Sequence, residues 1–395
     1  MSAKDRWLLP DGIEEILPAE ARRLEALRRG ILDLFAACGY ELVMPPLIEY
    51  LDSLQIGAAR DLDLQTFKLT DQLTGRLMGV RPDMTPQAAR IDAHYLKRNT
   101  PVRLCYIGSV LHTRPDEFGG SRPLQLGAEL FGHAGPESDA EVLGLMAASL
   151  DLAGIGDVHI DLGHVGIFRG LAAGARLAPE LEANLFDALQ RKARTEVEAL
   201  LAASAIAPAL RPMLLGLLDL SGGVDVLAEA QTRLGGAPEP VHRALQDLQR
   251  VAELVRRQPN APTLYVDLAE LSGYHYYTGV VFSAFVPGHG RAIAKGGRYD
   301  GIGRAFGRAR AATGFGADLR QWLRLSAGPE IPLTGILAPA EDDAPLRAEI
   351  ARLRAAGERV VARLPDDGAK AADYGCDRAL VKKNGRWIVE NLKNS

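Results

Sequence analysis

The feature that most constrains the fold is a series of short strand-like runs separated by turns, with no regular alternation of strand and helix. These runs cover residues 66–70, 76–80, 102–111, 122–132, 264–268, 275–285 and 291–295. A parallel sheet needs a long crossover, usually a helix, between successive strands, and this order does not supply one regularly. The sequence therefore predicts an α+β fold, an antiparallel sheet with flanking helices.

The beginning of the chain predicts a helix followed by an extended segment. Apolar residues at three- and four-residue spacing predict a helix that ends near Gly39. The extended run 40–50 follows directly and contains the pair Pro45-Pro46. Proline removes a hydrogen-bond donor from a sheet, so we expect this segment at a sheet edge or an interface.

Two later helices carry start signals. Thr85 followed by Pro86 is typical of an N-cap and a first helical residue. Ser138 and Glu141 have the spacing of a capping box, which predicts a helix through Leu150.

Length and composition predict the domain organisation. A chain of 395 residues allows two or three domains, each with its own core. We expect a main core over 1–326, with a helical insertion over 171–260 that is rich in Ala, Leu, Arg and Glu. A small C-terminal α/β domain over 331–395 should contain strands at 334–337 and 360–364, a helix over 344–355 and a hairpin turning at Asn384-Gly385.

Charge and cysteine content restrict the functional class. Lys and Arg total 46 against 50 Asp and Glu, a net charge of -4, which argues against a nucleic-acid-binding protein. No apolar run reaches the length of a membrane span, and the N-terminus lacks the apolar region of a signal peptide. Cys38, Cys105 and Cys376 lie far apart without metal-ligand spacing. We therefore expect a cytoplasmic protein with reduced, mostly buried thiols and no metal site.

The run 122–132 is the most informative candidate site. Alternation places Leu124, Leu126, Ala128 and Leu130 on one face of the strand and Gln125, Gly127 and Glu129 on the other. An amide and a carboxylate separated by a glycine can form the floor of a pocket for a ligand with an ammonium or imidazole N–H group. The alternative is the solvated face of an ordinary antiparallel sheet.

Two further groups could contribute to such a pocket. Tyr276 and Tyr277, in an aromatic run that enters a predicted strand, can wall a pocket, although strand aromatics also serve as simple packing. Asp83 and Thr85 could contact a ligand amine, although a helix cap explains Thr85 equally well. The glycine-rich run 296–301 lacks the spacing of a phosphate-binding loop.

Taken together, these motifs resemble a known family. The segments 40–50, Arg81-Pro-Asp-Met-Thr85, Tyr106-Ile-Gly108, Gln125 to Gly132, Tyr276-Tyr277 and Gly296 to Gly301 resemble, in order and spacing, the catalytic core of histidyl-tRNA synthetase, a class II aminoacyl-tRNA synthetase. The resemblance covers roughly residues 9–326. It implies a six- or seven-stranded antiparallel sheet, a helical insertion and dimerisation through 40–50. It also implies histidine-binding roles for Asp83, Thr85, Gln125, Glu129, Tyr276 and Tyr277.

The departures from the synthetase pattern concern the residues that would hold ATP. Adenylate formation requires arginines preplaced around the transferring phosphate. Where the synthetases have such arginines, this chain has His112, Ser272 and Gln321. His112 and Ser272 would lie at the pocket rim. Asp318 replaces a motif glycine, and a one-residue shift could bring Arg320 to the third arginine position.

A histidine pocket without the ATP-binding residues is similar to the regulatory subunit of ATP phosphoribosyltransferase. This resemblance implies a non-catalytic chain without a cofactor, which activates a short catalytic subunit and conveys feedback inhibition by L-histidine. The first alternative is an active histidyl-tRNA synthetase or an amino-acid-adenylating paralogue. The second is a stand-alone amino-acid sensor that acts on another partner.

Overall fold

The computed structural model describes residues 8–10, 12–56, 60–114, 123–204, 206–271, 273–274, 276–326 and 332–392. The chain separates into two compact units, Met1–Gly328 and Pro329–Ser395.

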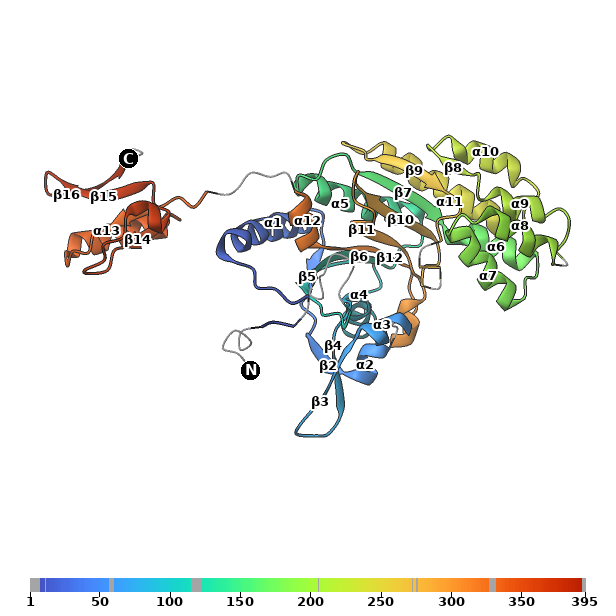
Figure 1. Cartoon of the computed structure of the whole chain (residues 1–395), viewed down its shortest axis with the longest axis horizontal. Coiled ribbons are helices and arrows are strands. Elements are labelled where there is room, and N and C mark those ends of the chain that lie inside the picture. The colour runs from blue at the N-terminus through green and yellow to red at the C-terminus, as the bar shows by residue number, and fades with distance from the viewer. Residues whose placement is uncertain are drawn as a thin grey trace. The chain divides into compact units, whose positions relative to one another are not determined.

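The first unit is built on a sheet of nine strands in the order β1-β5-β6-β12-β11-β10-β7-β9-β8 (Figure 1). The strands are β1 (Glu41–Leu42), β5 (Val102–Ser109), β6 (Leu124–Phe131), β7 (His159–His164), β8 (Ser221–Gly222), β9 (Thr263–Asp267), β10 (Val280–Phe285), β11 (Ala294–Arg298) and β12 (Ala312–Asp318). All pairings from β5 through β7 in that order are antiparallel, which confirms the predicted fold class. The sheet exceeds the expected six or seven strands because β1 and β9 add parallel pairings outside this core and β8 extends it further.

One face of this sheet is covered mainly by long helices. α1 (Pro18–Ala37), α5 (Pro136–Leu152), α11 (Glu239–Arg256) and α12 (Leu319–Leu325) lie on this side (Figure 1). Leu126, Ala128 and Leu130 of β6 are buried in the core cluster that these helices share. The apolar side of the strand is therefore the side that the alternation predicted.

The opposite face carries shorter elements. They are α2 (Leu51–Gln55), α3 (Arg60–Gln65), α4 (Thr85–Arg90), the π-helical turn η2 (Ile91–Leu96), the 3₁₀ turn η3 (Ile302–Phe306) and a small sheet in the order β2-β4-β3. In this sheet β2 (Ile48–Tyr50) and β3 (Phe67–Thr70) both pair antiparallel with β4 (Leu77–Val80), so the predicted hairpin is confirmed. The hairpin projects away from the main sheet (Figure 1).

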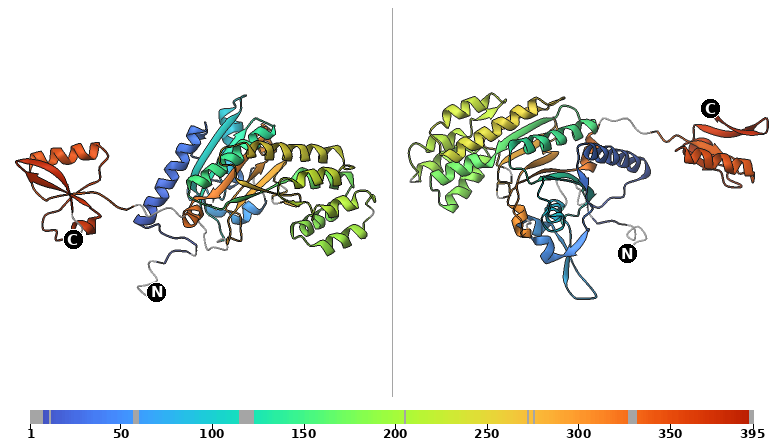
Figure 2. Two further views of the ribbon diagram at one scale, coloured as in Figure 1. Left: turned by 90° about the horizontal axis from the view of Figure 1, so that it is seen from above. Right: turned by 180° about the vertical axis from the view of Figure 1, so that it is seen from behind.

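Helices between β7 and β9 gather at one end of the main sheet (Figure 2). They are α6 (Val165–Gly174), α7 (Pro179–Gln190), α8 (Arg194–Ala202), α9 (Arg211–Gly216), α10 (Val226–Arg233) and α11. α11 packs against α5, α6 and α10 and joins this group to the core of the first unit.

The second unit is a four-stranded sheet in the order β14-β13-β15-β16. Its elements are β13 (Ile336–Ala338), α13 (Ala344–Ala355), β14 (Val360–Ala362), the 3₁₀ turn η4 (Ala371–Tyr374), β15 (Arg378–Lys383) and β16 (Arg386–Asn391). The predicted helix and hairpin are confirmed. Asn384 and Gly385 have φ angles of 48° and 76°, the positive values that a tight two-residue hairpin turn requires.

Both predicted helix caps are wrong. Thr85 is the first residue of α4, and its hydroxyl lies 2.9 Å from the Tyr106 hydroxyl rather than on a backbone N–H. α5 begins at Pro136, and the Ser138 hydroxyl donates to the carbonyl oxygen of Gly135 at 2.8 Å. Glu141 instead binds Arg103 of β5, with nitrogen–oxygen distances of 2.6 and 2.7 Å. Thr85 and Glu141 therefore have tertiary partners, and Ser138 has a partner within its own turn, in place of the contacts that the local pattern predicted at the helix ends.

The aromatic run before β10 also differs from its prediction. We expected Tyr276 and Tyr277 to enter a strand, but β10 begins at Val280. The backbone N–H groups of both tyrosines donate to the carbonyl oxygen of Gly273, so the two residues lie in a tight turn. Gly273 has a φ of 71°, which favours glycine at this position.

Candidate ligand site

A buried carboxylate lies at the centre of the candidate site. Glu129 of β6 is paired with Leu104 of β5 and Gly314 of β12 and is 1% exposed. The Tyr106 hydroxyl donates to Glu129 Oε1 at 2.8 Å, and the Tyr299 hydroxyl donates to the other carboxylate oxygen. The alternative of a solvated sheet face is therefore wrong at this position.

Burial determines the protonation of this carboxyl. Removal from water raises the pKa of Glu129 to about 8, although the hydrogen bonds from Tyr299 and Tyr106 act in the opposite direction. The negative charge of Asp83 adds to the increase. Near neutral pH the carboxyl therefore retains a proton that a bound cation would displace.

A second carboxylate lies at the beginning of α4. Asp83 Oδ1 accepts hydrogen bonds from Gln125 Nε2 at 2.6 Å and from the Thr85 N–H at 3.0 Å. The Gln125 Oε1 atom accepts from the Met84 N–H at 2.8 Å, which fixes the amide between β6 and α4. Because Thr85 also contacts Tyr106, the Asp83 group and the Glu129 group form one hydrogen-bonded network.

Three tyrosine rings form one wall of this network. Tyr276 stacks on Tyr299 with ring centroids 5.2 Å apart, and Tyr277 meets Tyr276 edge to face at the same distance. Burial raises the pKa of Tyr276 well above its usual value, so its hydroxyl stays protonated. Among the described residues, no group forms a hydrogen bond with the buried Tyr276 hydroxyl. A buried hydroxyl without a hydrogen-bond partner is available to form a hydrogen bond with a polar ligand.

Two glycines make room for this packing. A Cβ on Gly127 would lie 2.4 Å from the Tyr106 hydroxyl oxygen, and one on Gly314 would lie 1.5 Å from Glu129 Oε2. We expected the space at Gly127 to be open to a ligand, but the Tyr106 ring occupies it. The two glycines therefore seat Tyr106 and Glu129 rather than leaving an empty floor.

The sequence places two residues at the rim of the pocket, and the structure describes one of them. His112 Nε2 lies 2.9 Å from the carbonyl oxygen of Pro82, next to Asp83, so His112 borders the network. Ser272 lies outside the described residues.

The residues around the third expected arginine position make contacts within other parts of the first unit. Asp318 caps α12 by accepting from the Arg320 N–H at 3.0 Å. The Arg320 side chain is 5% exposed and its Nη2 lies 2.7 Å from Glu14 Oε2. Gln321 Nε2 lies 2.8 Å from His289 Nε2. Arg320 is thus held by the N-terminal segment beside α1 and α12.

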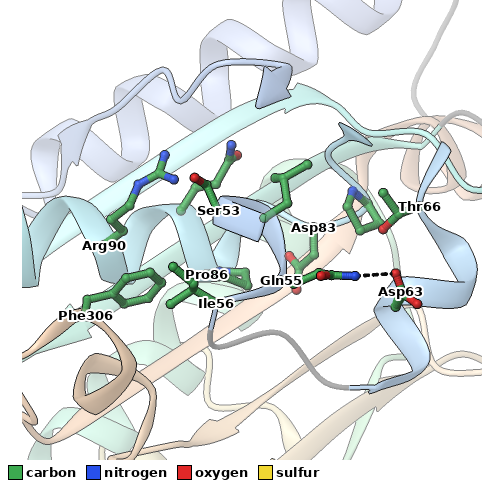
Figure 3. Close-up of a pocket in the computed structure, with 12 residues that line it drawn as sticks. Ser53, Gln55, Ile56, Asp63, Thr66, Asp83, Pro86, Arg90 and Phe306 are labelled. Carbon is green, nitrogen blue, oxygen red and sulfur yellow. Dashed lines mark hydrogen bonds between the residues drawn. The ribbon is translucent and has the colours of Figure 1, made fainter. Parts of the chain in front are cut away.

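A small cavity adjoins the network on the α4 side (Figure 3). It has a volume of about 20 Å³, enough for one water-sized group and too small for an amino acid. Its lining includes Ser53, Ile56, Asp83, Gln87, Arg90 and Phe306.

Sequence reasoning missed the two tyrosines that hold the central carboxylate. Tyr106 and Tyr299 belong to the motifs that carry the family resemblance, Tyr106-Ile-Gly108 and Gly296 to Gly301, but received no binding role. The pairing register between β5 and β6 shows which residues lie next to Glu129. Tyr106 is paired with Gly127, two residues from Glu129 on the same strand, so their side chains share a face.

Metal clusters, cysteine pairing and membrane-spanning helices were the other features that the sequence raised. No group of three or more His, Cys, Asp and Glu side chains is arranged to hold a metal ion among the described residues. Cys105 and Cys376 are buried and Cys38 is exposed, and all three are free thiols. None of the described helices combines the length and apolar character needed to cross a membrane.

Comparison with known proteins identifies both units. Residues 12–322 match the histidyl-tRNA synthetase family, and residues 333–390 match the family described as ATP phosphoribosyltransferase subunit HisZ C-terminal domain. A protein of Thioalkalivibrio sulfidiphilus named ATP phosphoribosyltransferase regulatory subunit is 55% identical over 99% of this chain and 100% of its own length. A protein of Alkalilimnicola ehrlichii with the same name is 57% identical over 99% of this chain and 98% of its own length.

Solved structures agree with this assignment. A protein of Bacillus halodurans described as an ATP phosphoribosyltransferase regulatory subunit/histidyl-tRNA synthetase is 28% identical and has a TM-score of 0.83 over 94% of this chain and 97% of that one. Histidyl-tRNA synthetase from Nostoc is 18% identical, covers 98% of this chain and 94% of that one with a TM-score of 0.76, and shares the fold. The chain therefore belongs to the family of ATP phosphoribosyltransferase regulatory subunits.

Proposed function

We propose that this chain is the non-catalytic regulatory subunit of ATP phosphoribosyltransferase. It activates a short catalytic subunit in the first step of histidine biosynthesis and conveys feedback inhibition by L-histidine. The relatives that match over nearly their full length carry this name, and the C-terminal unit matches a domain of the same subunit. We place the complex in the cytoplasm, where this biosynthesis takes place.

The observation that carries the histidine proposal is the Glu129 network. L-histidine offers an ammonium and an imidazole N–H, and the network offers the carboxylates of Glu129 and Asp83 with the unpartnered hydroxyl of Tyr276. The ligand's N–H groups would replace hydrogen bonds that Tyr106 and Gln125 now donate to these carboxylates. Thr85 and Tyr277 would border the bound ligand.

The decisive experiment is reconstitution. Purified chain is added to a short catalytic subunit, and the rate of phosphoribosyl transfer is measured with and without L-histidine. We expect the chain to raise the rate and L-histidine to lower it. If the chain neither binds the catalytic subunit nor changes its rate, the regulatory role is wrong and a stand-alone sensor is favoured.

Histidine-dependent ATP–pyrophosphate exchange tests the adenylating alternative on the same preparation. We expect no exchange, because His112 and Gln321 contact Pro82 and His289, and Arg320 pairs with Glu14. A transition state for adenylation needs preplaced positive charge that these contacts do not provide. Robust exchange would favour a synthetase-like enzyme.

Glu129→Gln tests the position of the histidine site. The substitution keeps the shape of the side chain but removes the negative charge that the carboxyl would take on when a ligand ammonium displaces its proton. We expect histidine affinity to fall by about 10-fold or more, measured by calorimetry. An unchanged affinity would mean that histidine binds elsewhere.

A further inference from the structure

The sheet of the second unit ends in an unbroken strand. β16 is the last strand in the order β14-β13-β15-β16, and all 6 of its residues are paired with β15 without a bulge (Figure 1). Natural sheets usually protect such an edge with a short strand, a proline or a bulge. The opposite edge is protected in this way, because β14 has only 3 residues and Pro365 follows shortly after it. β16 has none of these devices.

Every second residue of β16 directs its backbone groups towards the open edge. The Leu392 N–H donates to the carbonyl oxygen of Asp377 at 2.8 Å, which shows that even-numbered residues bond towards β15. The direction of hydrogen bonding alternates along an antiparallel strand, so Trp387, Val389 and Asn391 direct their N–H and C=O groups outwards. Within the described part of the chain, no group forms a hydrogen bond with these backbone atoms. The edge therefore offers a row of donors and acceptors to another strand.

The two faces of β16 differ in character. Trp387 belongs to the core that α13 covers. Ile388, on the opposite face, is 39% exposed, and Arg386 and Glu390 flank it on that face. Glu390 pairs with Lys383 of β15, whereas no carboxylate among the described residues pairs with Arg386. The exposed face of this edge strand therefore presents a cation, an apolar side chain and an anion in order along the chain.

This order is complementary to itself in one antiparallel register. When two copies of β16 pair about Ile388, Arg386 of each copy lies opposite Glu390 of the other, and the two Ile388 side chains are neighbours. Trp387 then lies opposite Val389, so that outward-facing backbone groups meet each other. A shift by one residue would set outward-facing groups against inward-facing ones, and a shift by two would place Ile388 opposite a charged residue. Of these registers, the one centred on Ile388 alone matches charge, apolar contact and backbone bonding together.

We propose that β16 is an interaction surface on which the β16 strand of a second copy of this chain docks, antiparallel and centred on Ile388. The contact has twofold symmetry, so each copy contributes the same residues and the two sheets become continuous. Pairing of one short strand buries little surface, so the contact is weak by itself. A chain that also dimerises through its first unit would therefore assemble beyond the dimer at high concentration. The inference does not depend on the proposed histidine site.

Disulfide trapping tests this register. Ile388→Cys is made in the full chain together with Cys38→Ser, which removes the exposed native thiol. In the proposed register the two introduced sulfurs face each other within reach of a disulfide bond. Under mild oxidation we expect the disulfide-linked dimer to form at least about 10-fold faster than for Leu364→Cys in the same background. Leu364 is the matched control, because it is 70% exposed in the second unit but lies outside β16.

Charge reversal tests the pairing of Arg386 with Glu390. In the Ile388→Cys background, Arg386→Glu places two carboxylates opposite each other and should slow cross-linking by at least about threefold. Adding Glu390→Arg makes the opposed charges unlike again and should restore most of the rate. Circular dichroism checks that each variant is folded.

Cross-linking of Ile388→Cys that is no faster than that of Leu364→Cys would overturn the inference and would leave the edge to a strand of another protein. Fast cross-linking that does not respond to either charge reversal would overturn the proposed register.

Discussion

Glu129 illustrates how a single residue connects stability with pH. Its carboxyl has a pKa of about 8 in the folded protein, well above the value of a solvated glutamate. The folded chain therefore binds this proton more tightly than the unfolded chain does. The corresponding stabilisation is complete at low pH and is lost as the pH rises towards 8.

We expect the free energy of unfolding of the native chain to fall by a few kcal/mol between about pH 5 and pH 8.5, and that of Glu129→Gln to fall much less. Two other buried groups act mainly at lower pH, since burial raises the pKa of Asp139 to about 6 and lowers that of His164 to about 4. Both are present in the two proteins, so the difference between the native chain and Glu129→Gln in urea unfolding at pH 6.5, 7.5 and 8.5 isolates Glu129. Parallel curves for the two proteins would contradict its assigned pKa.

Tyr276 allows a binding role to be separated from a structural one. Its buried hydroxyl has no partner among the described residues, so Tyr276→Phe should leave the free energy of unfolding unchanged or slightly higher. If histidine uses the hydroxyl, the same variant should bind it about 10-fold more weakly in calorimetry. Tyr299→Phe is the contrasting variant, because it removes a hydrogen bond to Glu129 and should reduce stability as well.

The local sequence predicted which face of β6 carries Gln125 and Glu129, because alternation along a strand is independent of context. It did not predict that Tyr106 and Tyr299 would hold the carboxylate. Those contacts depend on the register between β5 and β6 and on the return of the chain through β11, over separations of 23 and 170 residues. A local sequence pattern contains no information about contacts between residues that are so far apart in the chain.

At the scale of elements, the confirmed predictions rest on patterns among residues that are close together in the sequence. The β3–β4 hairpin and α13 were predicted from alternation, turn residues and helical spacing. The predicted caps at Thr85 and Ser138 failed because both hydroxyls found tertiary or turn partners. The spacing of the sequence predicts a helix through Tyr95 but not the π-helical geometry of η2. Its residue Asp92 is buried against Arg310 at 2.7 Å, a contact between distant segments.

The close approach of β12 to β6 predicts a sharp difference between two glycines of one strand. Gly314→Ala would place a methyl group 1.5 Å from Glu129 Oε2 and 2.9 Å from the Ala128 carbonyl oxygen, so we expect a loss of about 2 kcal/mol or more in unfolding free energy. Gly316→Ala meets no atom closer than 3.7 Å and should be tolerated. Chemical denaturation of both variants tests this. Equal losses would show that the space around Glu129 does not matter.

At the scale of the whole molecule, several basic side chains of the second unit are paired with carboxylates. Lys382 binds Asp343 at 2.8 Å, Arg378 binds Glu358 at 2.8 Å, and Lys383 is paired with Glu390. These ion pairs neutralise much of the positive charge that could attract a phosphate backbone. They support the expectation that nucleic acid is not a partner.

The family resemblance implies dimerisation through the segment 40–50, which we propose for this chain, and the proposal predicts that self-association depends on the exposed apolar residues of this segment. Met44→Glu places a charge on a side chain that is 77% exposed, so the fold should tolerate it while self-association weakens by at least about 10-fold in sedimentation. Leu364→Glu, at a leucine 70% exposed in the second unit, is the control and should associate normally. Equal association of both variants would place the interface elsewhere.

The two ends of the large sheet determine how a partner can attach. The sheet ends on one side in β1 and on the other in β8, and each is only two residues long. A peptide that extends a sheet by backbone hydrogen bonding needs a long free strand as its template. Neither terminal strand of the large sheet supplies one, so a partner that contacts β1 or β8 would have to recognise side chains rather than backbone. The selection of a catalytic subunit at either end of this sheet would then depend on the amino-acid sequence at the contact surface.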